Sequence, residues 1–400
     1  MTARKMIRIL FTAALALGAG VIVALWIEHS TPLTLPMPDG PFAVGRTLLD
    51  WVSDKPDGRH ELLAHLWYPA AAERSAATSE DYTPASMLPR GGLPGPALLK
   101  PLTWVFSLTS RDPAKVREHS FRDAAVSSRQ APYPVILLRG GASAEVARYS
   151  LLAEDLASHG YVVVGFDVPY RTSQVVFPDG RVIDEKPENN PELVEGAGLD
   201  ALAARLAQNW SADMSLALDQ LARLNDSDST GRFTGKLDMQ RVGAFGHSLG
   251  GSEALQFCYD DSRCKAALDL DGGLWGSFVH QDFSRPVMLL MSDHAGESDP
   301  ESTEIAANLH SFLARIPTEN RTAVMIRGAN HYMFSDDALL RSRPLMWSLR
   351  RLHITRIDSP RQLAITQYAI RSFFDAALKT SPASQPHVLT PEYPELQAFQ

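Results

Sequence analysis

The chain has few cysteines and no long run of basic residues, and these absences exclude several classes of protein. Only Cys258 and Cys264 occur among 400 residues, so a metal site built from four cysteine ligands is excluded. The formal net charge is −8, and no dense lysine and arginine cluster lies beyond the N-terminus. This charge pattern argues against a nucleic-acid partner. Internal repeats are also absent, which excludes a repeat architecture.

The residues that are present favour a folded α/β protein. Apolar residues make up 45% of the chain and charged residues 21%, which supports a sizeable core and excludes wholesale disorder. A length of 400 residues is ordinary for one large domain with insertions.

The N-terminus combines basic residues with a long apolar run. Basic residues at positions 4, 5 and 8 precede an uncharged stretch from Ile9 to Ile27, which Glu28 closes. The run is just long enough to span a bilayer as a helix. Residues 1–28 are therefore interpreted as an uncleaved signal anchor or a cleaved signal peptide, with a buried core helix as a third alternative. Small residues lie inside the run rather than after it, which favours the anchor. We expect an exported catalytic domain, membrane-anchored, or secreted if the segment is cleaved.

The remaining chain divides by composition. The proline-rich residues 29–45 predict a spacer leaving the membrane. We expect one α/β domain over residues 46–379, with insertions near 71–131 and 167–197 and a loose tail over 380–400.

Short apolar strands alternate with helical patterns from Pro134 onward. The expected strands and helices are given by residue range: strands 135–138, 161–166, 242–245, 266–270, 286–291 and 322–326, after an earlier strand at 60–68, and helices 149–159, 198–224 and 360–378, with another after residue 248. Continuous apolar strands alternating with helices predict a mostly parallel central sheet covered by helices on both faces.

The stretch RVGAFGHSLGG contains a candidate nucleophile. Ser248 lies in a Gly-x-Ser-x-Gly pattern directly after a strand and before a helical pattern. A strained turn of this kind lifts a serine hydroxyl above the sheet edge, and the N–H of Leu249 can then face an oxyanion. The alternative is a glycine-rich structural turn.

A serine hydroxyl needs a base, and His331 is the best candidate among the twelve histidines. It follows the strand 322–326 and a Gly-Ala-Asn turn, which is where the base of such a fold lies. We expect His247, next to the serine, to pack into the protein instead.

The acid that orients the base has two candidates. Asp271 follows the strand 266–270, and Asp293 follows the strand 286–291. Asp269 lies within its strand and is the weaker choice, because it is lower on the same face.

The two cysteines are six residues apart in CYDDSRC. In an exported chain, a disulfide between Cys258 and Cys264 can close this short loop. Two buried free thiols are the alternative.

Four segments resemble the plasma-type platelet-activating factor acetylhydrolases, also called isoform II: YSLLAEDLASHGYVVVGFD (149–167), GHSLGG (246–251), ALDLDGGLWG (267–276) and HYMFSD (331–336). The resemblance runs in order over most of the chain and implies an α/β-hydrolase fold. It implies Asp271 as the acid and the Ala142 N–H as the second oxyanion donor. The family's oxyanion loop usually reads His-Gly-x-Gly, whereas this chain has Gly-Gly-Ala-Ser at 140–143.

Together these features predict a serine carboxylic ester hydrolase that acts through an acyl-enzyme on Ser248. The resemblance implies short-chain acyl esters, including phospholipid acetyl esters, as small-molecule or lipid substrates. No metal or organic cofactor is expected. One alternative is a cutinase- or lipase-like carboxylesterase with Asp293 as the acid. Another is a non-catalytic, membrane-tethered binding protein with a hydrolase fold.

Overall fold

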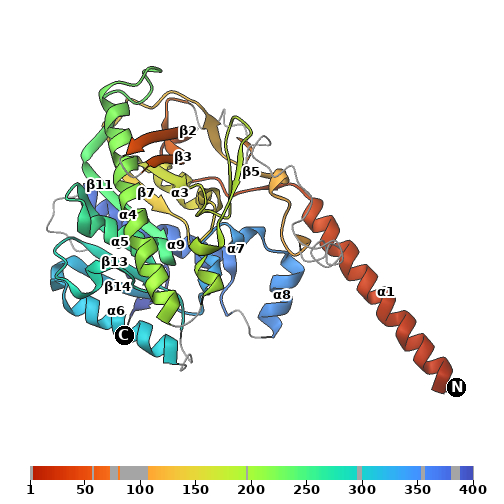
Figure 1. Cartoon of the computed structure of the whole chain (residues 1–400). Helices are drawn as coiled ribbons and strands as arrows, with labels where there is room; N and C mark the ends of the chain where they lie inside the picture. The colour runs from red at the N-terminus through yellow and green to blue at the C-terminus, as the bar shows by residue number, and fades with distance from the viewer. Residues whose placement is uncertain are drawn as a thin grey trace.

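The computed structural model describes residues 3–55, 58–72, 80–81, 107–194, 197–294, 300–352, 356–379 and 388–399. A central sheet with helices on both faces makes up the main body, and helix α1 (Ala3–Ser30) projects from it (Figure 1). Much of the expected insertion near 71–131 lies outside the described residues.

In the described part of the chain, the central sheet has ten strands in the order β15-β14-β13-β12-β11-β7-β8-β3-β2-β6. These strands are β2 (Ala43–Lys55), β3 (Gly58–Ala70), β6 (Ser120–Arg122), β7 (Tyr133–Arg139), β8 (Val162–Asp167), β11 (Leu237–His247), β12 (Cys264–Leu270), β13 (Val287–Met291), β14 (Arg321–Ile326) and β15 (Leu396–Ala398). The strands from β8 to β14 in this order pair in parallel, while β3 and β15 flank them in antiparallel. The expectation of a mostly parallel central sheet is confirmed.

Among the described residues, five further short strands lie outside the central sheet: β1 (Leu33–Thr34), β4 (Glu80–Asp81), β5 (Val116–Glu118), β9 (Gln174–Val176) and β10 (Val182–Asp184). The hairpin of β9 and β10 lies in the insertion expected near 167–197.

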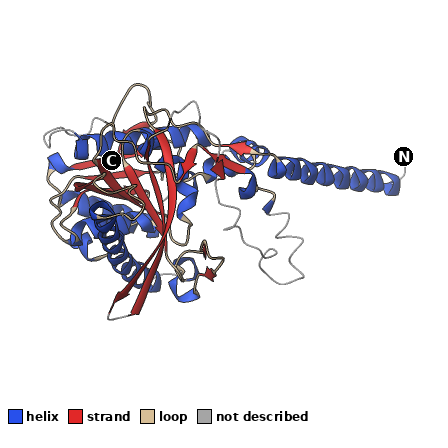
Figure 2. Ribbon diagram, turned by 90° about the horizontal axis from the view of Figure 1, so that it is seen from above, coloured by secondary structure: helices blue, strands red, loops and turns tan. Residues whose placement is uncertain are grey.

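Helices cover the two faces of the sheet (Figure 2). The described helices after α1 are α3 (Ser150–Ser158), α4 (Ala197–Asp226), α5 (Leu249–Asp260), α6 (Pro300–Ala314), α7 (Asp337–Leu340), α8 (Arg343–Arg351) and α9 (Ser359–Phe374). The interior of β7 is apolar throughout because both of its faces are covered. Val135 and Leu137 pack in the hydrophobic cluster that includes residues of α4, α5 and α6. Ile136 and Leu138 pack in the cluster on the other face, with residues of α3 and α9. Alternate residues thus face different helical layers, which makes every strand position buried.

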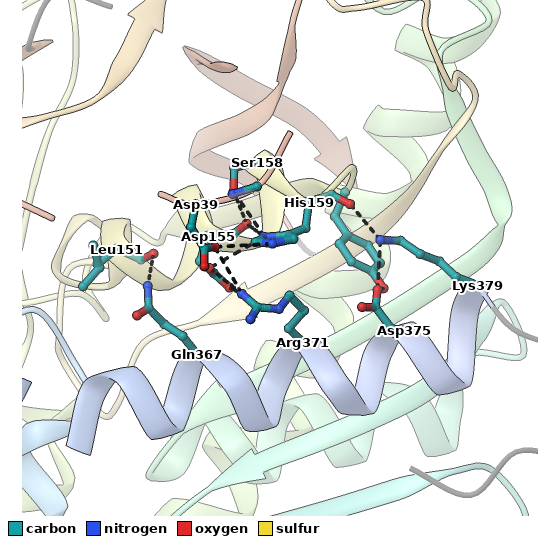
Figure 3. A network of polar contacts seen from close by, with 11 residues as sticks. Asp39, Leu151, Asp155, Ser158, His159, Gln367, Arg371, Asp375 and Lys379 are labelled. Carbon is teal, nitrogen blue, oxygen red and sulfur yellow. Dashed lines mark hydrogen bonds and ion pairs between the residues drawn. The ribbon is translucent and has the colours of Figure 1, made fainter. Parts of the chain in front are cut away.

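The segment expected to be a spacer, residues 29–45, packs against the domain. Asp39 lies 3.4 Å from Nε2 of His159 and 3.6 Å from Nη1 of Arg371 on α9, as Figure 3 shows. Arg371 also binds Asp155 at 2.8 Å. The Arg371 guanidinium thus pairs with the carboxylates of both Asp39 and Asp155. This ion-pair network attaches residues 29–45 to α3 and α9.

Backbone contacts extend this attachment. The Phe42 N–H donates to the Ser158 carbonyl oxygen at 3.0 Å, and the Phe42 ring is buried. Strand β2 then begins at Ala43. The proline-rich composition predicted a spacer, but it did not show that apolar side chains within the segment, such as Leu35 and Phe42, are buried.

The C-terminal residues also differ from the expected loose tail. β15 pairs antiparallel with β14, and both Val388 and Leu396 are buried. A three-residue strand carries too few positions for a visible alternation, so its sequence gave no strand signal.

Helix α1 has the length and composition to cross a membrane. Its segment from Ile9 to Ser30 spans 22 residues and contains an 18-residue stretch with a mean hydropathy of 2.3, which the rest of the described protein does not bury. A signal sequence would pass the same test. At the end of α1, Glu28 accepts hydrogen bonds from the Ser342 hydroxyl at 2.8 Å and the Arg343 N–H at 3.0 Å, which joins α1 to the start of α8.

Candidate active site

Ser248 occupies a strained turn between β11 and α5. Its backbone has φ 56° and ψ −128°, a left-handed φ that a residue with a side chain rarely adopts. Glycine is required on both sides of it, because a Cβ on Gly246 would lie 2.0 Å from the Gly250 oxygen. A Cβ on Gly250 would lie 2.3 Å from the Gly140 oxygen. The Gly-x-Ser-x-Gly pattern therefore lets three stretches of backbone pass in contact beneath the serine.

The two residues whose backbone N–H groups are expected to bind an oxyanion, Leu249 and Ala142, belong to segments that border Ser248. Leu249 is the first residue of α5, so its N–H has no acceptor within the helix. The loop after β7 passes directly beside the serine, since a Cβ on Gly141 would lie 3.2 Å from Ser248 Cβ. Ala142 follows with φ 28°. The insertion near 167–197 holds this loop, because the Ser173 N–H donates to the Ser143 oxygen at 2.7 Å.

His331 and Asp271 are in direct contact. Asp271 follows β12 with φ 55°, and its Oδ2 lies 2.8 Å from Nδ1 of His331 in the turn after β14. An ionised carboxylate only accepts hydrogen bonds, so Nδ1 of His331 carries the proton that is donated. In the neutral imidazole, Nε2 is then the unprotonated nitrogen and is able to accept a proton.

Asp271 is buried and ionised. Its side chain is 0% exposed, and burial alone would raise the pKa of its carboxyl group. Hydrogen bonds from His294 and His331 outweigh burial and hold this pKa well below its usual range. The Ser292 N–H also donates to Oδ1, at 2.7 Å. Asp271 is therefore a fixed negative charge behind His331.

The other two aspartates considered for this role point elsewhere. Asp293 Oδ2 accepts from the Gly328 N–H at 2.7 Å and lies 3.8 Å from Arg356. Asp269 is fully buried below the site, where it accepts from the Gly272 N–H at 3.0 Å. Burial and the neighbouring Asp271 charge raise the pKa of Asp269 well above its usual value. The structure thus brings Asp271, and neither alternative, to His331.

The contact expected between Ser248 and His331 is not a hydrogen bond in this structure. Within the described part of the chain, Ser248 Oγ makes no hydrogen bond to His331. Nucleophile–base contacts are often loose without substrate and tighten in the complex.

Sequence reasoning missed a hydrogen-bonded chain that joins the oxyanion loop to the base. The Gly141 N–H donates to Tyr149 Oη at 3.0 Å, and Tyr149 Oη lies 2.9 Å from Nδ1 of His247. His247 Nε2 lies 2.9 Å from the carbonyl oxygen of His331. The carbonyl needs a donor, so Nε2 carries the His247 proton and Nδ1 accepts from tyrosine. Burial, followed by the nearby His331, lowers the pKa of His247 to about 3, so it stays neutral.

His247 is thus buried, as its position beside the serine predicted, and its ring both packs against Phe334 and makes hydrogen bonds through its two nitrogens. Residues Tyr149 and His294 carried no sequence signal, because their partners are distant in the chain.

Cys258 and Cys264 form a disulfide. It joins the C-terminal part of α5 to the first residue of β12, and so ties the element after Ser248 to the strand that leads to Asp271.

Comparisons with known proteins identify the family and the fold of this chain. The family described as platelet-activating factor acetylhydrolase, isoform II, matches residues 27–174 and 216–382. A probable 1-alkyl-2-acetylglycerophosphocholine esterase of Arthroderma benhamiae is 28% identical over 277 residues, covering 65% of this chain and 64% of that protein. The platelet-activating factor acetylhydrolase of Bos taurus is 25% identical over 232 residues, covering 51% of this chain and 48% of that protein. The chain therefore spans about half to two thirds of the length of these relatives.

Among solved structures, a ferulic acid esterase from Streptomyces cinnamoneus superposes with a TM-score of 0.69 at 24% identity. The match covers 92% of this chain and 100% of the esterase, which shows the α/β-hydrolase fold. With the family match extending over well over half of its residues, the chain belongs to the platelet-activating factor acetylhydrolase isoform II family.

Proposed function

We propose that the protein is a serine carboxylic ester hydrolase with Ser248 as nucleophile, His331 as base and Asp271 as acid. The observation that carries this proposal is the contact between His331 Nδ1 and Asp271 at 2.8 Å, on loops beside the strained Ser248 turn. All three residues follow carboxyl ends of adjacent or nearby parallel strands, so they share one edge of the sheet.

The reaction proceeds in two acyl-transfer steps. His331 Nε2 takes the Ser248 hydroxyl proton as the oxygen attacks the ester carbonyl, and the resulting imidazolium is stabilised by Asp271. The N–H groups of Leu249 and Ala142 donate to the oxyanion, and losing one such donor typically costs about 3 kcal/mol of barrier. His331 then protonates the leaving alcohol, and water cleaves the acyl-enzyme with His331 again as base. These steps require no metal or organic cofactor.

The substrate proposal rests on the relatives. Two of them are named for acetyl hydrolysis of platelet-activating factor or of 1-alkyl-2-acetylglycerophosphocholine. We infer that this chain acts on short-chain acyl esters, with phospholipid acetyl esters among them.

An amphiphilic substrate suits a membrane location. We infer that α1 anchors the catalytic domain on the outer side of the membrane, on the basis of its apolar length and preceding basic residues. N-terminal sequencing of the mature protein, together with alkaline extraction of membranes, tests this. An intact N-terminus in the extracted membrane fraction supports an anchor, whereas a chain that starts beyond α1 identifies a cleaved signal.

The activity test compares nitrophenyl esters of increasing acyl length beside a short-acyl phospholipid, with Ser248→Ala as the control. Wild type is expected to prefer acetyl and butyryl esters, and the variant to lose turnover. A preference for long acyl chains would support a lipase-like esterase instead. Failure of wild type to hydrolyse any ester or to react with a fluorophosphonate would support a non-catalytic binding protein.

A further inference from the structure

His294 is a second imidazole on the carboxylate of Asp271. Its Nε2 lies 2.9 Å from Asp271 Oδ1, while His331 occupies Oδ2 on the other side of the carboxylate. His294 follows β13, three residues beyond its last strand position, so the histidine approaches from a different loop than His331 does. Asp271 is thus held between imidazoles from two loops.

The hydrogen atoms can be assigned from chemistry. Asp271 is an ionised acceptor, so Nε2 of His294 must carry a proton and donate it to Oδ1. The Ser292 hydroxyl oxygen lies 3.1 Å from the same nitrogen and, beside a protonated Nε2, acts as an acceptor of that N–H. The Ser292 backbone N–H supplies the other donor to Oδ1 at 2.7 Å. Oδ1 therefore receives one fixed backbone donor and one side-chain donor.

The two imidazoles differ in their surroundings. The side chain of His294 is 42% exposed and that of His331 is 32% exposed, whereas the Asp271 side chain is 0% exposed. His331 also packs against His247, whose ring centre lies 4.6 Å away. His294 thus contacts the candidate triad through Asp271 and is not a triad member in the mechanism above.

We propose that His294 is a positioning residue: its N–H to Oδ1 fixes the rotation of the Asp271 carboxylate so that Oδ2 stays directed at His331. This inference rests on the proposed function for its kinetic consequences only. A carboxylate held by donors on both oxygens keeps the imidazole of the base in one orientation, and misplacement of a catalytic group by about 1 Å can cost about 100-fold in rate.

The charged and titratable groups around this contact come from several elements. Asp269 lies in β12 and Asp271 directly follows it, and Asp293 precedes His294. His331 contacts the other oxygen of the Asp271 carboxylate, and His247 packs against His331. Because pH changes would act on several of these groups together, the test uses substitutions at fixed neutral pH.

Two substitutions separate hydrogen bonding from bulk. His294→Ala removes the donor, and His294→Gln places an amide N–H near the position of Nε2 without an imidazole. We expect His294→Ala to lower kcat about 10- to 100-fold with little change in KM, and His294→Gln to restore most of the loss. His310→Ala, which removes an exposed histidine stacked on Phe399, serves as the matched control and is expected to behave as wild type.

A double-mutant cycle tests whether His294 acts through Asp271. In an Asp271→Asn background, His294→Ala should lower kcat by no more than about twofold further, because the carboxylate that His294 contacts has already been replaced. An equal fold-loss in both backgrounds, or a His294→Ala enzyme with wild-type kcat, would overturn the proposal. So would a His294→Gln variant as impaired as His294→Ala.

A spectroscopic readout separates this inference from the enzymatic activity. The proton on His331 Nδ1, bound to Asp271, is observed by NMR of histidine-labelled protein. We expect its resonance to shift or broaden in His294→Ala and to remain in His294→Gln and His310→Ala. If these resonance changes are found but the wild-type protein hydrolyses no ester, the positioning role of His294 is supported and the proposed function is contradicted. An unchanged resonance in His294→Ala contradicts the positioning role, whatever the activity.

Discussion

His331 Nδ1 lies 2.8 Å from Asp271 Oδ2 across a sequence separation of 60 residues. The two residues follow β14 and β12, which are separated in the sheet by β13. Asp293, which follows β13 itself, contacts the Gly328 turn instead. The proposed acid therefore follows the strand next to that of the proposed nucleophile.

This relationship predicts different effects of two aspartate substitutions. Asp271→Asn should lower kcat about 10³- to 10⁴-fold, because an amide cannot stabilise the imidazolium or fix the histidine tautomer in the same way. Asp293→Asn should keep turnover within a few fold, since its amide oxygen can still accept from Gly328. Steady-state kinetics on a nitrophenyl ester measures both, and the reverse ranking would contradict the assignment of the acid.

Asp269→Asn is the matched control for Asp271→Asn. Asp269 is fully buried and points away from His331, and its Oδ1 accepts from the Gly272 N–H at 3.0 Å. The amide oxygen of asparagine can still accept this hydrogen bond. We expect kcat within a few fold of wild type and an unfolding transition close to that of wild type. A loss as large as that of Asp271→Asn would show that the negative charge of Asp269 is needed.

Tyr149→Phe should destabilise the protein by about 1–3 kcal/mol, because it leaves both the Gly141 N–H and His247 Nδ1 without their partner. Urea denaturation followed by fluorescence measures the free energy of unfolding. Tyr133→Phe is the control, since the buried Tyr133 hydroxyl has no hydrogen-bond partner among the described residues. Equal destabilisation by the two substitutions would mean that the Tyr149 hydroxyl contributes no hydrogen bond of consequence.

Because His247 is neutral in the folded protein, the free energy of unfolding is expected to depend on pH in the acidic range. Its pKa is lowered to about 3 in the folded protein, below the ordinary value of 6.5 that applies on unfolding. Between these values the unfolded chain binds a proton that the native protein does not, so stability falls as the pH decreases. This contribution is about 1.4 kcal/mol per pH unit. Denaturation curves at several pH values should show a shallower dependence in His247→Asn, and an identical slope would contradict the burial of a neutral imidazole.

Removing the disulfide should lower the free energy of unfolding by about 2 kcal/mol, the loop-closure value for so short a loop. Cys258→Ser with Cys264→Ser, compared with wild type by thermal denaturation, tests this. Wild type treated with a reductant should approach the double variant, whereas a thermal midpoint that neither change alters would show that the bridge does not stabilise the fold.

The sequence predicted best those features that depend on residues close together in the chain. The continuous apolar strands and the Gly-x-Ser-x-Gly turn depend on neighbours in the chain, and the sheet and the strained Ser248 turn were predicted from them. His331 was identified by its place after the last parallel strand, and the structure puts it in contact with Asp271.

Contacts between distant segments could not be predicted in the same way. Asp271 and Asp293 both end strands, and only three-dimensional packing directs one carboxylate toward His331. β15 and the attachment of Asp39 depend on partners that are distant in the chain, with no periodic pattern to reveal them. Tyr149 and His294 were missed for the same reason.

The most direct test of the account is the mass of the protein quenched during turnover of nitrophenyl acetate. Wild type should carry one added acetyl group, located on Ser248 by peptide sequencing, and should release nitrophenol in a burst when deacylation is slower. Ser248→Ala should show neither the adduct nor the burst. Turnover of the ester by Ser248→Ala at the wild-type rate, or an acetyl group found on another residue of wild type, would contradict the assignment of Ser248 as the nucleophile.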